Sequence, residues 1–229
     1  MNILIFYGAY GGGHLSAARS IKECIEQNFD GHTTKLVDCI DYISPTINKL
    51  STKAYAEMAK KTPKLWGQLY SHAEKGSLSK LTIASNKLMS KKLYKFFDEF
   101  NPDLIISTHP FSTQMCAMLR KEGKINAKIA TILTDYAPHE QWLLYHEYAD
   151  YYFVAHEGMR DELLQKGIPS FKVFSTGIPL SNRFLQSYNK EETLKNFDLS
   201  IDKGTVLFFA GGEFGLRKKQ NFCNLKIIN

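Results

Sequence analysis

The chain has 229 residues, 44% of them hydrophobic, and a formal net charge of +6. This composition supports a buried globular core and excludes an intrinsically disordered chain. The four cysteines follow no zinc or disulfide spacing, which indicates reduced thiols in a cytosolic protein. No window reaches the ~20 apolar residues that span a bilayer, and the short N-terminal apolar run lacks the basic leader of a signal peptide.

The first element is an apolar run, Asn2–Tyr7, which predicts a β-strand. A glycine-rich turn follows at residues 8–13, and a helix-forming stretch continues to near Phe29. Strand, glycine loop and helix in this order predict the opening of a Rossmann-like unit. His14 falls in the first turn of the helix, where an imidazole can take a proton from a bound hydroxyl. The alternative is a histidine that only caps or packs the helix end.

The positive charge is concentrated after the second predicted strand, Thr33–Asp38. Between residues 46 and 95, eleven lysines oppose two glutamates, a local net of +9, so the remainder sums to about −3. Interleaved apolar residues predict two or three amphipathic helices, broken near Pro63 and Gly76. Such surfaces bind anionic membrane lipids, and no nucleic-acid motif accompanies this one; an ordinary solvated face is the alternative. The residues expected at the membrane are Lys60, Lys61, Lys64, Trp66, Lys80, Lys87, Lys91 and Lys92.

The rest of the chain continues to alternate strands with helices. The predicted strands cover residues 103–108, 128–134, 151–155 and 172–175, and the predicted helices cover residues 113–121 and 157–166. Alternation of this kind predicts an α/β fold with a Rossmann-like, doubly wound parallel sheet.

A second unit is predicted to begin near the end of the chain. Residues 1–188 form the first domain, and the polar residues 189–203 form a linker. Residues 204–229 contain a fresh apolar strand that enters a glycine loop. Because a strand and a loop alone cannot bury a core, we expect a truncated second domain, shortened by a truncated or frameshifted reading frame.

Five motifs occur in an order that resembles a known family. They are Gly11-Gly12-Gly13-His14 with Ser16-Ala17-Ala18, Thr108-His109-Pro110-Phe111, Thr134-Asp135-Tyr136 with His139 and Trp142, Thr176-Gly177-Ile178-Pro179, and Gly211-Gly212-Glu213-Phe214-Gly215. The chain resembles the processive diacylglycerol glucosyltransferases and the monogalactosyldiacylglycerol synthases. The related cell-wall N-acetylglucosaminyltransferase shares the opening pattern. The chain departs from the family at Arg217, where another glycine is usual.

The resemblance implies the N-terminal half of a GT-B glycosyltransferase. In that family the N-terminal domain holds the lipid acceptor and the C-terminal domain binds the UDP-sugar. The implied reaction transfers glucose or galactose from UDP-hexose to diacylglycerol, with inversion and with no further cofactor. The implied location is cytoplasmic, peripheral on the inner face of the cell membrane, with diacylglycerol and anionic lipids as partners.

The resemblance also implies roles for individual residues. His14 is the expected base, and Asp135 is expected to orient it or to contact acceptor hydroxyls. The acceptor-binding residues are Gly12, Gly13, His109, Pro110, His139 and Trp142. The donor-binding residues, vestigial without a complete second domain, are Gly211, Gly212, Phe214 and Gly215. The alternatives are a capping aspartate, a rigid His-Pro turn, a surface histidine and a core tryptophan.

Other functions remain open at this point. Gly11 and Gly13, followed by Ser16, form an imperfect dinucleotide fingerprint, and Asp38 ends the second strand where a ribose-binding acid belongs. A dinucleotide-binding oxidoreductase is therefore one alternative. A catalytically inactive lipid- or membrane-binding module is another. The histidines after residue 135 fit no zinc spacing, so no metal is expected.

Overall fold

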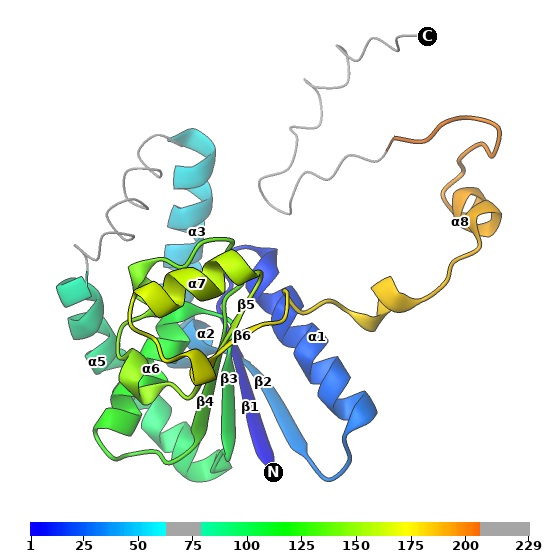
Figure 1. Cartoon of the computed structure of the whole chain (residues 1–229). Helices are drawn as coiled ribbons and strands as arrows, with labels where there is room; N and C mark the ends of the chain where they lie inside the picture. Colours follow the sequence, from blue (N-terminus) through cyan, green and yellow to red (C-terminus); the bar gives the residue numbers. More distant parts are fainter. Residues whose placement is uncertain (63–78, 207–229) are drawn as a thin grey trace.

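Six parallel strands form one sheet in the order β2-β1-β3-β4-β5-β6 (Figure 1). The computed structural model describes residues 1–62 and 79–206, without the side chains of residues 59, 60, 79–86 and 88. The strands are β1 (Asn2–Tyr7), β2 (Thr33–Asp38), β3 (Leu104–Ser107), β4 (Lys128–Ile132), β5 (Tyr151–Val154) and β6 (Val173–Ser175). The chain leaves β1 to one side for β2 and returns to the other side for β3. This reversal is a topological switch point, where open α/β sheets bind ligands.

Helices cover both faces of the sheet, which confirms the predicted α/β class (Figure 1). Helix α1 packs through Ala18 against Ile3 and Ile5 on one face. The opposite face carries the larger core, built with buried side chains from α2, α5, α6 and α7. The helices are α1 (Gly12–Asn28), α2 (Cys39–Ile43), α3 (Pro45–Lys61), α5 (Ser79–Phe100), α6 (Pro110–Lys121), α7 (Glu157–Gln165) and α8 (Lys190–Asn196).

Strand β1 is buried on both faces because helices pack against both sides of the sheet at this strand. Leu4 and Phe6 belong to the larger core, whereas Ile3 and Ile5 face α1. Strands covered on both faces read as continuous apolar runs, which is why β1 was predicted with its observed bounds. Its carboxyl end delivers the chain directly into the glycine loop.

Two differences from the predicted bounds affect the site. Helix α6 begins at Pro110, three residues earlier than predicted, because proline is favoured in a first helical turn and His109 caps it. Strand β4 ends at Ile132 instead of residue 134. Thr134 and Asp135 therefore lie in the loop beyond the strand, where their side chains are not committed to the sheet.

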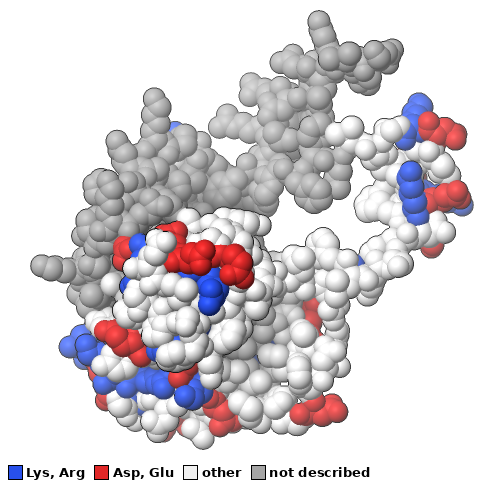
Figure 2. Space-filling view, in the orientation of Figure 1, with Lys and Arg blue, Asp and Glu red and all other residues white. Residues whose placement is uncertain are grey.

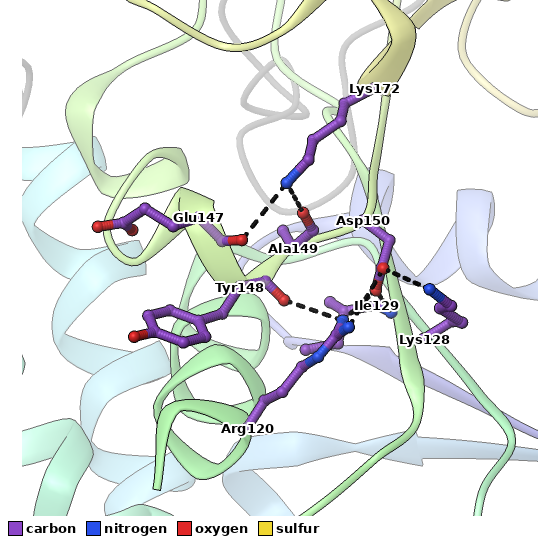
Figure 3. Close-up of polar contacts among 8 residues, drawn as sticks. All are labelled: Arg120, Lys128, Ile129, Glu147, Tyr148, Ala149, Asp150 and Lys172. Atoms are coloured by element: carbon purple, nitrogen blue, oxygen red, sulfur yellow. Dashed lines mark hydrogen bonds and ion pairs between the residues drawn. The ribbon is translucent and has the colours of Figure 1, made fainter. Parts of the chain in front are cut away.

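A charged network fixes the opposite end of the sheet, where β4 and β5 begin (Figure 3). Asp150 accepts hydrogen bonds from Arg120, from Lys128 Nζ at 3.0 Å and from the Ile129 amide at 2.9 Å. Burial acts to raise the pKa of Asp150, but these donors outweigh it and hold the pKa below its usual value. Lys172 Nζ donates to the Ala149 carbonyl at 2.7 Å and ties β6 to the same corner.

The lysine-rich segment is described only in part. Lys61, Lys87, Lys91 and Lys92 are exposed, as the membrane prediction requires, but Lys61 pairs with Glu57 and Lys92 Nζ donates to the Ile43 carbonyl at 2.9 Å. The predicted breaks near residues 63 and 76 lie outside the described residues, as do Lys64 and Trp66 and the side chains of Lys60 and Lys80. In the described ranges, no helix combines the length and apolar character needed to cross a membrane.

The predicted linker contains the short helix α8, which extends away from the sheet (Figure 1). Acidic and basic side chains alternate on its surface (Figure 2). Before it, Ser181 Oγ donates to Glu23 Oε2 at 3.2 Å and ties the chain to α1. The predicted glycine loop of the second unit, with Gly211, Gly212, Phe214 and Gly215, lies outside the described residues.

Candidate active site

The candidate site lies at the carboxyl edge of the sheet, beside the switch point between β1 and β3. His14 follows β1, His109 follows β3, and Asp135 follows β4. The His14 and His109 rings meet edge to face with their centroids 4.7 Å apart. The structure thus brings together three predicted side chains from distant parts of the chain.

The glycine loop leaves the start of α1 accessible. Gly11 has a φ of +84°, which disfavours any side chain there. A Cβ at Gly11, Gly12 or Gly13 would meet no heavy atom within 4 Å, so open space lies over this turn. No side chain caps the N-terminus of α1. The backbone of Gly12 and Gly13 is therefore approachable by a ligand, as the acceptor-binding prediction requires.

The His14 ring is held by its Nδ1 atom. Nδ1 lies 2.5 Å from the Thr108 carbonyl oxygen and 2.9 Å from Thr134 Oγ1. Thr108 Oγ1 in turn donates to the His14 carbonyl at 2.9 Å, so main chain and ring are both anchored. Burial lowers the pKa of His14 below its ordinary value, although the Thr108 carbonyl and the Asp135 charge act in the opposite direction. The imidazole is consequently neutral near pH 7, the form that can take a proton.

His109 is a buried, neutral histidine. Its Nδ1 accepts the Phe111 amide hydrogen at 3.3 Å, which caps α6 and leaves the ring proton on Nε2. The ring stacks on Tyr10 with centroids 5.2 Å apart. Burial and the neighbouring His14 and His139 hold the pKa of His109 well below its ordinary value. His109 is therefore suited to donate a hydrogen bond, and the adjacent Pro110 is buried in the first turn of α6.

Asp135 is engaged by two aromatic side chains. Trp142 Nε1 donates to Asp135 Oδ2 at 2.8 Å, and His139 Nε2 lies 3.5 Å from the same oxygen. Burial acts to raise the pKa of Asp135, but His139 and Trp142 outweigh it and keep the carboxyl ionised. Trp142 is fully buried, so in this structure its indole holds Asp135 and exposes no stacking face. Asp135 influences His14 through its charge.

Helix α3 contributes residues that sequence reasoning did not select. Ser51 Oγ lies 2.7 Å from the Tyr10 hydroxyl oxygen, and the Tyr55 ring meets Tyr10 edge to face at 5.8 Å between centroids. Burial raises the pKa of the Tyr55 hydroxyl, and the charge of Asp135 raises it further. The start of the lysine-rich segment is thereby linked to the glycine loop. In the sequence, Tyr55 is marked only by the apolar spacing of its helix, and no pattern marks Ser51.

The geometry does not favour the dinucleotide alternative. Asp38 accepts the Ile40 and Asp41 amide hydrogens at 3.1 and 3.0 Å and so caps α2. A carboxylate used in this way is not presented to a ribose. In the part of the chain that the structure describes, no cluster of histidine, cysteine, aspartate and glutamate has the arrangement of a metal site.

The sheet and this edge define the class: a Rossmann-like α/β domain with a histidine-containing site at its switch point. The family model described as monogalactosyldiacylglycerol (MGDG) synthase matches residues 14–180, a range that holds every candidate active-site side chain named above from His14 to Trp142. The chain belongs to this family.

Curated relatives extend the match over nearly the whole chain. The processive diacylglycerol beta-glucosyltransferase of Staphylococcus epidermidis is 30% identical over 217 residues, which are 94% of this chain and 54% of the relative. That of Staphylococcus saprophyticus is 31% identical over 231 residues, 99% of this chain and 56% of the relative. The chain thus spans about half the length of the curated relatives it matches.

Two solved structures are similar in part. The apo lipopolysaccharide outer core galactosyltransferase WaaB is 12% identical with a TM-score of 0.42, covering 76% of this chain and 45% of its own. The UDP-GlcNAc 2-epimerase of Neisseria meningitidis is 16% identical with a TM-score of 0.42, covering 78% of this chain and 46% of its own.

Proposed function

We propose that the chain is the acceptor-binding half of a GT-B glycosyltransferase that transfers hexose from UDP-hexose to diacylglycerol. Membership of the MGDG synthase family and the names of the staphylococcal relatives support the reaction class. The observation that carries the proposal is the His14 ring, anchored through Nδ1 beside an open glycine turn. That arrangement leaves Nε2 as the atom able to take a proton.

In the proposed step, the acceptor hydroxyl oxygen bonds to the anomeric carbon while its proton passes to His14 Nε2. The bond from that carbon to the diphosphate breaks, and UDP leaves with the electron pair. A single displacement of this kind inverts the anomeric centre. Because burial lowers the pKa of His14, the base is unprotonated at pH 7, and the rate falls as the pH drops through that lowered pKa.

The acceptor is proposed to lie over the glycine turn. The Gly12 and Gly13 backbone allows close approach, and the Nε2–H of neutral His109 can donate to an acceptor oxygen. His139, which is partly buried beside Asp135, completes this side. The donor diphosphate is proposed to be bound by the C-terminal half of such an enzyme, and Gly211, Gly212, Phe214 and Gly215 would be the vestige of that donor site in this chain.

Membrane contact is proposed through the lysine-rich segment. Exposed Lys87 and Lys91 are four residues apart on α5, and their charge reaches Glu122 near the end of α6. Basic residues near an anionic surface add ~1 kcal/mol each to binding. We propose a peripheral position on the inner face of the cell membrane, where diacylglycerol and anionic lipids are both available.

Transfer of label from UDP-[14C]glucose or UDP-[14C]galactose into lipid tests the reaction. The chain is incubated with vesicles of anionic lipid containing diacylglycerol, and labelled glycolipid formed from either donor would support transfer by this chain. His14→Gln removes the basic nitrogen with little change in volume, and we expect at least about a hundredfold loss. Equal turnover by the unaltered chain and by His14→Gln would reject His14 as the base.

A second function has one observation in its favour. The exposed Lys87 and Lys91 of α5 would support membrane binding without any turnover, as in a lipid-binding module. For such a module we expect vesicle binding that depends on diacylglycerol, no labelled product, and the same vesicle binding in His14→Gln. The transfer assay therefore separates the two functions.

A further inference from the structure

The Nδ1 atom of His14 faces two oxygen atoms that are far from it in sequence. The Thr108 carbonyl oxygen is 94 residues away and lies at 2.5 Å, and Thr134 Oγ1 is 120 residues away and lies at 2.9 Å. A carbonyl oxygen can only accept, so Nδ1 must carry the hydrogen in the neutral ring. An unprotonated Nδ1 would instead turn its lone pair toward the carbonyl oxygen at this short distance.

The hydroxyl of Thr134 must then act as an acceptor as well. If Thr134 donated to Nδ1, the nitrogen would lack its hydrogen and would repel the Thr108 carbonyl. The two oxygens thus share one N–H donor, and together they fix both the tautomer and the rotation of the ring. Asp135 does not hold the His14 ring in this way. Its carboxylate accepts a hydrogen bond from Trp142 Nε1 and lies 3.5 Å from His139 Nε2.

We infer that Thr134 is a positioning residue which, with the Thr108 carbonyl, keeps the proton of neutral His14 on Nδ1 and leaves Nε2 as the base. This inference rests on the proposed function for its catalytic consequence. Asp135 then supplies a charge near the ring without orienting it. When Nε2 takes up the acceptor proton, the Nδ1–H bonds become charge-assisted and stabilise the imidazolium.

The tautomer is measured directly on the full chain by nitrogen-15 NMR of labelled histidine. The sequence contains seven histidines, and the spectrum of His14→Gln identifies the His14 signals. In the unaltered chain we expect hydrogen on Nδ1 of His14 across the neutral range. A signal pattern with hydrogen on Nε2 would overturn the inference, whatever the result of any activity assay.

Substitutions at two neighbouring positions separate Thr134 from Asp135. Thr134→Val removes the hydroxyl with nearly the same shape and leaves the Thr108 carbonyl to hold Nδ1 without it. The ring can then rotate away from the carbonyl, and part of the neutral population is expected to shift to the Nε2–H tautomer. Thr134→Ser retains a hydroxyl and restores the original tautomer. Asp135→Asn is expected to lower the His14 titration midpoint, because its charge raises the pKa of His14, while the tautomer stays unchanged.

A matched control is Thr131→Val, which removes a hydroxyl 3.3 Å from Thr113 Oγ1 in the same segment without touching His14. Thr131→Val is expected to leave the nitrogen-15 signals of His14, and therefore its tautomer, unchanged. An unchanged tautomer in Thr134→Val, or an altered tautomer in Asp135→Asn, would overturn the inference. Where turnover is present, Thr134→Val is expected to lower kcat about tenfold with KM within about twofold, and Thr134→Ser to recover it.

The NMR readout needs no donor sugar and no product. If the transfer assay fails, the proposed reaction is rejected, whereas the tautomer result still decides the role of Thr134. If the tautomer result fails while transfer succeeds, the base remains His14 and only its positioning is reassigned.

Discussion

Gly8 is the position where one added methyl group most directly disturbs the site. A Cβ there would approach His109 Cδ2 to 2.8 Å and Cγ to 2.9 Å. Carbon atoms attract best at about 3.5–4.0 Å, so the overlap is roughly 0.7 Å or more. The ring has little freedom to retreat, because it stacks on Tyr10 and accepts the Phe111 amide hydrogen.

Gly8→Ala is therefore expected to cost about 2 kcal/mol, within the ~1–3 kcal/mol typical of overpacking. For a chain of 229 residues this lowers Tm by about 4–8 °C. Thermal unfolding followed by circular dichroism measures the shift. Gly12→Ala is the matched control, since its Cβ would meet nothing within 4 Å, and its Tm should not fall.

A double substitution tests the cause. Replacing His109 by alanine removes the ring that the new methyl group meets, so Gly8→Ala should cost almost nothing in a His109→Ala background. Additive effects of the two substitutions would refute the overlap as the source of the loss. An unchanged Tm in Gly8→Ala alone would refute the packing described around His109.

Three further predictions concern the sheet, the α3 contact and the basic surface. Asp150→Asn is expected to cost about 1.5–3 kcal/mol at pH 7. Because the folded pKa of Asp150 is depressed, its stabilisation is lost as the pH falls below the ordinary pKa of an aspartate and through the lowered folded pKa, and a Tm–pH series of the variant should be flatter there. Tyr10→Phe and Ser51→Ala each remove the same 2.7 Å hydrogen bond, so urea unfolding should show costs of about 0.5–1.5 kcal/mol that are not additive. Lys87→Gln with Lys91→Gln should weaken binding to anionic vesicles by about 2 kcal/mol at low salt, measured by co-sedimentation, with Tm unchanged; equal binding would reject this surface.

Much of the fold follows from local patterns. The bounds of β1 and β2 agree with the predicted ranges. Strand β1 is a continuous apolar run, and β2 alternates the exposed Thr33 and Lys35 with the half-buried Thr34 and Leu36. The start of α6 was missed because it depends on the His109 side chain capping its own helix, a local geometry that apolar periodicity does not report.

The site was predicted less completely than the fold. Motif order selected His14, His109 and Asp135, and the structure brings them to one edge. The oxygens that hold His14 come from residues 94 and 120 positions away, so no local pattern links them to it. The contact from α3 through Ser51 depends equally on long-range packing.

Co-sedimentation with vesicles of anionic lipid, with and without diacylglycerol, tests most directly whether this chain is an acceptor-binding half. The measurement needs no donor sugar, so it reports lipid binding independently of sugar transfer. We predict binding that weakens with salt and is tightened by diacylglycerol at every salt concentration. The same affinity with and without diacylglycerol would contradict acceptor recognition by this domain.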